Sequence, residues 1–573
     1  MMSLTRSALL TAAVLPALLA ASGCGGPADT PSPASPQAAT PAFNDEEIAR
    51  AGEAIRADGL KAHIAILSDD KMEGRLPGTA GEELAVAYIR DAYQELGLEP
   101  ANGDSYEQPV PLVGITGNPS MALKVTGSGQ ERTFRYKDEF MGFSSREQEK
   151  VEASGELVFV GYGTVAPEFD WDDYKGMDVN GKILVMLVND PPLPDESRFG
   201  GKAMTYYGRW TYKYEMGAEK GAAGVIIIHE TEKAGYPWSV VAGSWAGEQF
   251  SPVSADQGAG RLPFESWMTG EAAAELMTMA GQDLDALKAA AARDDFVPVP
   301  LGLSASISIE NSIRRVQSRN VAGLLPGTDL ADEWVIYTAH WDHLGVSDPV
   351  DGDAIYNGAF DNATGVASLL DIARAFVALP RAPRRSILFL AVTAEEQGLI
   401  GSYHYADNPL HPLAKTAALI NMDGMNVLGQ TRDVLIIGLG NTTLDDLVTQ
   451  VAATQGRTIK GDMEPEKGFY YRSDQFPFAK KGVPAIYTDH GIDYVDRPEG
   501  WGLEQNALYT RANYHKPSDE FDPGWDLTGM VEDTRMLFQV GLLAAQDDAM
   551  QQWKEGTEFK AVRERSLAAG GGR

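Results

Sequence analysis

The stretch Trp334–Gly345, with the sequence WVIYTAHWDHLG, decides how this chain is read. Its first part, Trp334 to Thr338, is mostly aromatic or β-branched, which is typical of a buried strand. A short polar loop follows and presents His340, Asp342 and His343. A His-x-Asp at a strand end often offers an imidazole to a metal, while the carboxylate orients the ring. Alone, the motif also fits a surface loop with a hydrogen-bonded histidine. The choice between a metal site and such a loop therefore depends on later segments of the chain.

From this strand onward the chain alternates between strand and helix patterns. Strands are predicted near 386–392, 417–422, 434–437 and 483–488, and helices near 363–379, 396–406, 442–455 and 528–547. Such alternation predicts an α/β domain with a mostly parallel mixed sheet flanked by helices. In sheets of this kind, sites form in the loops at the carboxyl ends of the strands.

Chemically reactive side chains recur at those strand ends and helix starts. They are Asp361, Glu395, Glu396, Asp423 and His515. Together with His340 they supply two imidazoles, four carboxylates and no thiol, a set that suits two divalent cations such as zinc. Two zinc ions, three ligand carboxylates and a hydroxide would be neutral overall, which makes burial tolerable.

A plainer interpretation treats these residues one by one. Asp361 would then cap its helix, and the Glu395-Glu396 pair would favour a helix start. Five metal-compatible positions at successive strand ends favour the metal site over five unrelated roles.

Composition narrows the classes of partner. The chain has 573 residues, of which 81 are acidic and 48 basic, for a net charge of −33. This balance argues against nucleic acid or an anionic membrane surface as a partner, since both need basic patches. Cys24 is the one cysteine, which excludes an intrachain disulfide and a thiolate zinc site.

The first residues have the pattern of an export signal. Arg6 precedes the apolar run Ala8–Ala21, which is too short to span a membrane. Small residues before Cys24 resemble a bacterial lipoprotein cleavage site, although an ordinary secretory peptide would also fit. We therefore expect a signal peptide at 1–23 and a flexible tether at 24–42. The expected product is an exported lipoprotein at the outer membrane, facing the periplasm or the cell surface, with the lipid on Cys24 as its membrane contact.

The motifs carry a family resemblance. HWDH, AFDNATG, AEEQG, NMD and YHKPSDE, in this order, resemble the zinc aminopeptidase family that contains bacterial leucyl aminopeptidase and aminopeptidase Y. Glutamate carboxypeptidase and the transferrin receptor ectodomain are more distant relatives. The resemblance implies two Zn²⁺ per chain, one held by His340, Asp361 and Asp423. The second would be held by Glu396, His515 and the bridging Asp361.

The same resemblance implies roles around the metals. Glu395 would be the general base, and Asp342 would orient His340 from behind. A cis peptide bond would follow Asp361. A tyrosine near Tyr470 would stabilise the tetrahedral intermediate, with Tyr470 favoured over Tyr471, although aromatic packing would also explain both rings.

The domain boundaries are predicted from the change in residue pattern along the chain. Residues 43–135 and 305–550 are assigned to the zinc peptidase domain and 136–304 to a β-rich insert. The insert resembles the protease-associated domain in its GYG, NGKILV and KGAAGVIII segments. The polar, glycine-ended segment 551–573 is expected to be a loose tail.

The predicted function is that of an exported zinc aminopeptidase that acts on peptides through a water shared by two metals. A carboxypeptidase or dipeptidase on the same centre is the first alternative, and Arg472 is then the one motif-borne candidate for a substrate carboxylate. A non-catalytic, receptor-like binding protein is the second. The sequence leaves the oligomeric state open.

Overall fold

The structure of the chain, a computed structural model, describes residues 42–193 and 198–569. The expected signal peptide, Cys24 and all but the last residue of the expected tether lie outside these ranges. Within them, no helix combines the length and the apolarity that crossing a membrane requires.

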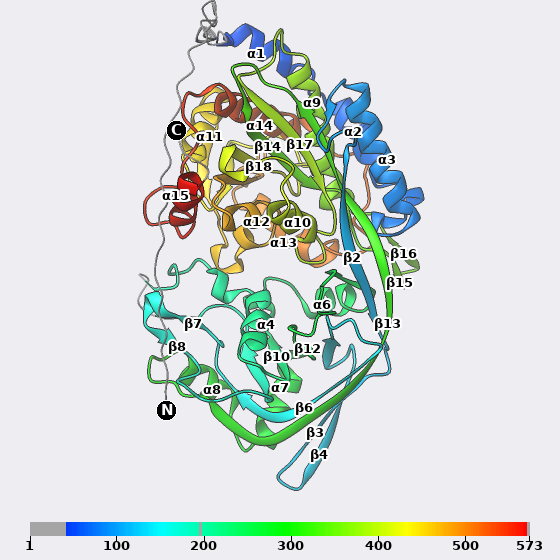
Figure 1. The fold of residues 1–573 in the computed structure, drawn as a ribbon, viewed down its shortest axis with the longest axis vertical. Coiled ribbons are helices and arrows are strands. Elements are labelled where there is room, and N and C mark those ends of the chain that lie inside the picture. The colour runs from blue at the N-terminus through cyan, green and yellow to red at the C-terminus, as the bar shows by residue number, and fades with distance from the viewer. Residues whose placement is uncertain (1–41, 194–197, 570–573) are drawn as a thin grey trace, which may run out of the picture. The chain divides into compact units, whose positions relative to one another are not determined.

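A mixed sheet forms the centre of the peptidase domain (Figure 1). Its strand order is β20-β19-β21-β18-β14-β17-β13-β2-β11. The four strands at its middle run parallel: β21 (Ala485–Asp489), β18 (Thr416–Asn421), β14 (Leu330–His340) and β17 (Arg385–Val392). The outer strands are β20 (Thr458–Gly461), β19 (Asp433–Ile437), β13 (Val299–Leu325), β2 (Glu107–Gly117) and β11 (Gln249–Pro252). The predicted α/β class and mostly parallel core are confirmed.

Helices cover both faces of this sheet because the parallel strands are apolar on both faces. Val335 and Tyr337 of β14 point to one face and Ile336 to the other. The first face is covered by α1 (Asp45–Gly52), α2 (Ala57–Leu67), α3 (Ala80–Glu95), α9 (Thr364–Val377), α11 (Leu444–Thr454) and α14 (Thr528–Gln546). The second is covered by α10 (Ile400–Asp407) and α12 (Gln475–Lys480).

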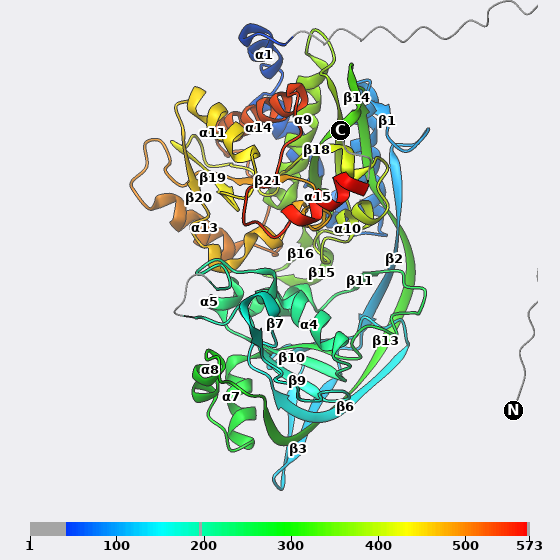
Figure 2. The same cartoon turned by 60° about the vertical axis from the view of Figure 1, so that its left-hand side comes forward.

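The long strand β13 belongs to two sheets. Its second half pairs with β2 and β17 in the central sheet, and its first half pairs with β6 (Lys150–Phe159) and β3 (Ala122–Gly127) in a second sheet. Figure 2 shows it curving from one sheet into the other. The second sheet has the order β4-β3-β13-β6-β9-β10-β12-β5. Its remaining strands are β4 (Gln130–Arg135), β9 (Ile183–Leu187), β10 (Gly224–His229), β12 (Glu265–Thr269) and β5 (Phe140–Phe143).

This pairing shifts the boundary expected for the insert. The hairpin of β3 and β4 was assigned to the peptidase domain but pairs with the insert's sheet. Leu123 and Val125 of β3 are buried in the insert's core. The alternation of apolar and polar residues does not report which of two sheets a strand joins. The insert's helices include α4 (Trp210–Glu219), α6 (Trp238–Ser244), α7 (Gly270–Met279) and α8 (Leu284–Ala291).

The segment after α14 is docked on the domain rather than loose. The Trp553 indole nitrogen donates to the Gly482 carbonyl at 3.0 Å, and α15 (Lys560–Ala569) follows. The buried Arg563 guanidinium donates to the carbonyls of Leu413 and Thr416 at 3.1 and 2.9 Å. The prediction of a loose tail is therefore wrong for 551–569, because a few large side chains anchor an otherwise polar segment.

Candidate metal centre

Five separated segments bring the predicted ligands to one place at the carboxyl edge of the parallel strands. His340 ends β14, Glu396 follows β17, and Asp423 lies two residues beyond β18. Asp361 lies in the short helical segment Ala359–Ala363 before α9, and His515 follows α13 (Trp501–Ala512). The edge position explains why strand ends were informative in the sequence.

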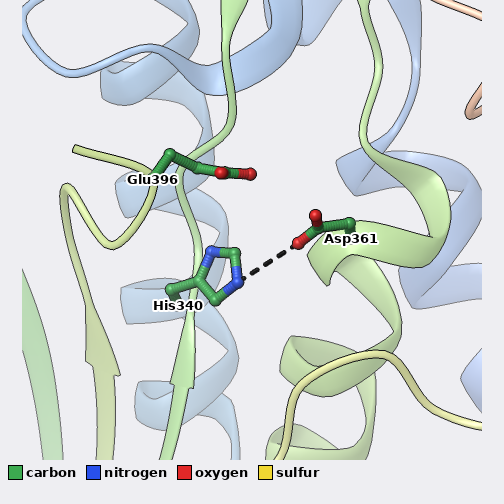
Figure 3. A group of neighbouring side chains, drawn as sticks. All are labelled: His340, Asp361 and Glu396. Carbon is green, nitrogen blue, oxygen red and sulfur yellow. Dashed lines mark ion pairs between the residues drawn. The ribbon is translucent and has the colours of Figure 1, made fainter. Parts of the chain in front are cut away.

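Asp361 lies between the two histidines. Its Oδ1 is 3.3 Å from the Nε2 of His340, and its Oδ2 is 3.4 Å from the Nε2 of His515. His340 Nε2 is also 3.3 Å from Oδ1 of Asp423, and His515 Nε2 is 2.9 Å from Oε2 of Glu396. Each oxygen of Asp361 thus faces a different imidazole, as a carboxylate shared by two metals would require. Figure 3 shows His340, Asp361 and Glu396 pointing toward one another from three parts of the chain.

The donor set fits zinc. Ligand atoms of His340, Asp361 and Glu396 lie within 4.8 Å of one another, and so do those of His340, Glu395 and Asp423. Nitrogen and carboxylate oxygen donors are ligands that zinc accepts. The two groups share His340.

The negative charges around these ligands also favour the binding of cations. Seven carboxylates are buried or nearly so here: Asp342, Asp361, Glu395, Glu396, Asp423, Asp474 and Asp519. Burial of so many like charges is unfavourable without positive partners. Burial works against a charged His340, but the carboxylates of Glu395 and Asp423 raise the pKa of His340 well above its usual value.

Glu395 differs from the ligands in its surroundings. Burial raises the pKa of Glu395 well above its usual value, and although His340 opposes this, the carboxylates of Asp423 and Asp474 add to it. Its carboxylate lies 3.9 Å from the Nε2 of His340, farther than the carboxylates of Asp361 and Asp423.

The loop that carries Asp361 is fixed from two sides. The peptide bond between Asp361 and Asn362 is cis, as the family resemblance implied. The Asp519 carboxylate accepts hydrogen bonds from the backbone N–H groups of Phe360 and Asp361, each at 3.0 Å. Gly358 has φ +56°, and a Cβ there would collide with the Asp361 carbonyl and the His343 ring. Asp519 lies within the quoted YHKPSDE motif, but its partners could not be inferred from the sequence.

The buried side chain of Arg75 also stabilises the loops around the metal centre. Its guanidinium donates to the carbonyls of Trp341, Asn357 and Gly358 at 2.8, 2.6 and 2.9 Å. It therefore connects the loop after His340 with the loop before Asp361. Arg75 is the first residue of the glycine-rich segment RLPGTAG. Its hydrogen bonds therefore place this segment next to the metal centre.

Asp342 contacts other groups than expected. The ring nitrogen Nδ1 of His340 lies 3.2 Å from the Asp342 backbone carbonyl and 3.8 Å from its carboxylate. The carboxylate instead accepts from the backbone N–H groups of Glu395 and Glu396 at 3.0 and 3.4 Å. The Asp342 side chain thus orients the loop that carries both glutamates, while its main chain orients His340.

The two remaining histidines of this region are hydrogen-bonded. His343 Nδ1 is 2.5 Å from Oε1 of Glu396, and His490 Nε2 is 2.9 Å from Oδ1 of Asn506.

A cavity of about 700 Å³ opens onto the centre between the peptidase domain and the insert. Tyr471 and Arg472 line it, but Tyr470 does not. The Tyr470 ring packs against Phe559 and Tyr471, with centroids 6.1 and 5.4 Å away. The structure therefore assigns Tyr470 to aromatic packing, the alternative that its sequence position left open.

Two other side chains of the cavity wall were missed in the sequence. Tyr514 lies directly before His515, and their ring centroids are 3.9 Å apart. Ser473 donates to Oδ2 of Asp423 at 2.7 Å. Their positions beside the predicted ligands His515 and Asp423 became apparent only in the structure.

Comparison with known proteins finds a family match within the chain. Residues 320–538 match the family model described as peptidase family M28. The match to peptidase family M28 therefore covers this segment of the chain. The matched segment includes His340, Asp361, Glu396, Asp423 and His515.

The curated relatives include proteins named as aminopeptidases and proteins named as carboxypeptidases. Aminopeptidase NAALADL1 of Mus musculus is 36% identical over 129 residues, 22% of this chain and 16% of that protein. A glutamate carboxypeptidase 2 homolog of Caenorhabditis elegans is 26% identical over 430 residues, 64% of this chain and 51% of that protein. Aminopeptidase YwaD of Bacillus subtilis is 26% identical over 211 residues, 36% of this chain and 40% of that protein. The chain thus spans about half or less of the length of these relatives.

One solved structure resembles the fold over most of its length. An aminopeptidase from Aneurinibacillus sp. strain AM-1 superposes with a TM-score of 0.52 at 18% identity, covering 88% of this chain and 97% of that one. At this identity the likeness concerns the fold.

Proposed function

We propose that this protein is an exported, zinc-dependent aminopeptidase that removes N-terminal residues from peptides. The observation that carries the proposal is the shared position of Asp361 between two imidazoles at the floor of an open cavity. Its donors suit two zinc ions, one on His340, Asp361 and Asp423, the other on Asp361, Glu396 and His515. When bound, the ions would polarise the scissile carbonyl and lower the pKa of the attacking water.

Glu395 would move the proton. It lines the cavity, and Asp342 holds its backbone N–H at 3.0 Å. A carboxylate with a raised pKa can accept the proton of the attacking water and return it to the leaving amine. Tyr514 lines the cavity beside His515, and its hydroxyl is our candidate for stabilising the oxyanion.

A second function, cleavage beside a free C-terminal carboxylate, is favoured by a specific observation. Arg209 and Arg472 both line the cavity, and among the described residues neither guanidinium has a carboxylate within 4.0 Å. Burial, together with the neighbouring Arg472, lowers the pKa of Arg209 to about 10. Arg472 lies over the rings of Tyr236 and Phe469, 5.2 and 5.1 Å from their centroids. Two cations without carboxylate partners could bind a substrate carboxylate.

One substrate panel separates the two functions. It contains aminoacyl chromogenic substrates, peptides blocked at the amino end and peptides amidated at the carboxyl end. An aminopeptidase cleaves substrates with a free amine and not the amino-blocked peptides, loses activity with a chelator and regains it with zinc. Cleavage of amino-blocked peptides together with loss of the amidated ones would support the carboxypeptidase.

An arginine variant makes the same distinction within one enzyme. If the arginines bind a substrate carboxylate, R472Q should raise the KM of peptides with a free carboxyl end roughly 10- to 100-fold, as expected for loss of a charge-assisted hydrogen bond. The KM of aminoacyl chromogenic substrates, which lack that carboxylate, should not change. An equal effect on both substrate classes would contradict the carboxylate role.

A further inference from the structure

His515 has one ring nitrogen directed into the centre and one directed away from it. Nε2 faces Glu396 and Asp361, at 2.9 and 3.4 Å from their oxygens. Nδ1 lies 3.2 Å from the Oγ of Ser244. With Nε2 directed to a metal, the proton of the neutral ring is on Nδ1, and Nδ1–H donates to the serine hydroxyl.

Ser244 does not belong to the peptidase domain. It is the last residue of α6, in the insert, and lies 271 positions before His515 in the chain. It lines the same cavity as His515. Figure 1 shows α6 on the side of the insert that lies toward the peptidase domain.

The contact matters because the second nitrogen of a metal-bound histidine has to be held. Histidine ligands donate this N–H to an oxygen, which fixes the tautomer and the ring orientation, and loss of that acceptor typically weakens metal binding 10- to 100-fold. His515 depends on such a contact because it has φ +56° in a loop, beyond the end of α13.

The two histidines of the centre differ in the origin of this acceptor. For His340 it is the backbone carbonyl of Asp342, two residues along the same loop. For His515 it is a side chain of the insert. The contact to His340 is thus made within the peptidase domain, whereas the contact to His515 comes from the insert.

The hydroxyl is held in place by its own surroundings. The Gln249 amide donates to the Ser244 carbonyl at 2.7 Å, and the Trp238 indole donates to the Lys137 carbonyl at 2.8 Å. Trp245 packs its ring against Trp210, with centroids 5.9 Å apart. These contacts fix both ends of α6.

We infer that Ser244 is a positioning residue for His515, through which the insert completes the second metal site. The inference rests on the proposed function in taking His515 as a metal ligand. It gives the insert a part in metal binding in addition to lining the cavity.

The test is zinc binding to the full mature chain, measured by titrating the metal-free protein against a chelator of known affinity. Wild type should bind two zinc ions. S244A should bind the first as wild type does and the second roughly 10- to 100-fold more weakly. S244T, which restores a hydroxyl, should recover most of the loss. S239A, a change at an exposed serine of the same helix, should match wild type.

Several results would overturn the inference. Equal second-site affinity in S244A and wild type would do so, as would a wild type that binds fewer than two zinc ions. A loss in S244A that S244T does not restore would assign the effect to packing. Because the readout is metal binding, a wild type that binds two zinc ions but cleaves no peptide would reject the proposed function and leave this inference intact.

Discussion

Glu395 and Glu396 are adjacent in the chain but face different surroundings. Burial and the Asp361 carboxylate oppose ionisation of Glu396, yet two neighbouring imidazoles lower its pKa to about 2. Glu395 has a pKa well above its usual value, because it is buried among other carboxylates. Adjacent side chains diverge, so one glutamate can bind a metal while the other exchanges protons. At many hydrolytic sites, two titratable groups with well-separated pKa values have different roles in the reaction.

This division predicts the behaviour of E395Q. The amide keeps the size of the side chain but cannot accept the proton of the attacking water. We expect kcat to fall roughly 10²- to 10⁴-fold with zinc content unchanged. Metal analysis and kinetics on the same preparation measure both quantities.

E396Q is the matched control one residue away. It replaces a group placed among the ligands, so we expect it to lose zinc as well as activity. If E395Q, fully loaded with zinc, turned over at a near-normal rate, Glu395 would not be the base.

At the scale of elements, the parallel strands explain why the sequence was informative. Four strands end at one edge, so the residues that follow them meet, and the metal-compatible set could be predicted from alternation and residue type. Contacts between residues of different elements could not be predicted in this way. Ser473 reaches Asp423, Asp519 reaches the Asp361 backbone and Ser244 reaches His515 only once the chain has folded.

Strand β12 of the insert's sheet carries a carboxylate with its own pH dependence. Glu265 of β12 is partly buried and accepts from the Ser145 hydroxyl at 2.6 Å. Burial raises the pKa of Glu265 to about 7, against the weaker opposing effects of Ser145 and Arg261. Between its ordinary value and about 7, the folded state binds this proton more often than the unfolded state. The contribution of Glu265 to the free energy of unfolding therefore falls as pH rises through this window.

E265Q should remove this dependence. The amide still accepts from Ser145 and carries no charge, so we expect E265Q to exceed wild type in free energy of unfolding by about 1–3 kcal/mol at pH 8, with little difference at pH 4.5. Denaturant unfolding of both proteins at the two pH values measures this. A difference independent of pH would contradict the assigned ionisation.

At the scale of the whole described chain, two cores are joined by shared strands. β13 lies in both sheets, and β11, from within the insert, pairs with β2 in the central sheet. The sequence predicted two modules because the insert has a β-rich residue pattern and the peptidase domain alternates between strand and helix patterns. It did not predict where they meet, since a strand that passes from one sheet to another keeps the same alternation throughout. The cavity and the Ser244 contact both lie at this junction and depend on it.

The most direct test of the central claim is a titration of the metal-free protein with zinc while hydrolysis of a leucine chromogenic substrate is followed. The account predicts that a metal-free preparation is inactive, that activity is complete at two equivalents, and that further zinc adds nothing. Full activity without metal, or no activity with two zinc ions bound for any substrate of the panel, would contradict it.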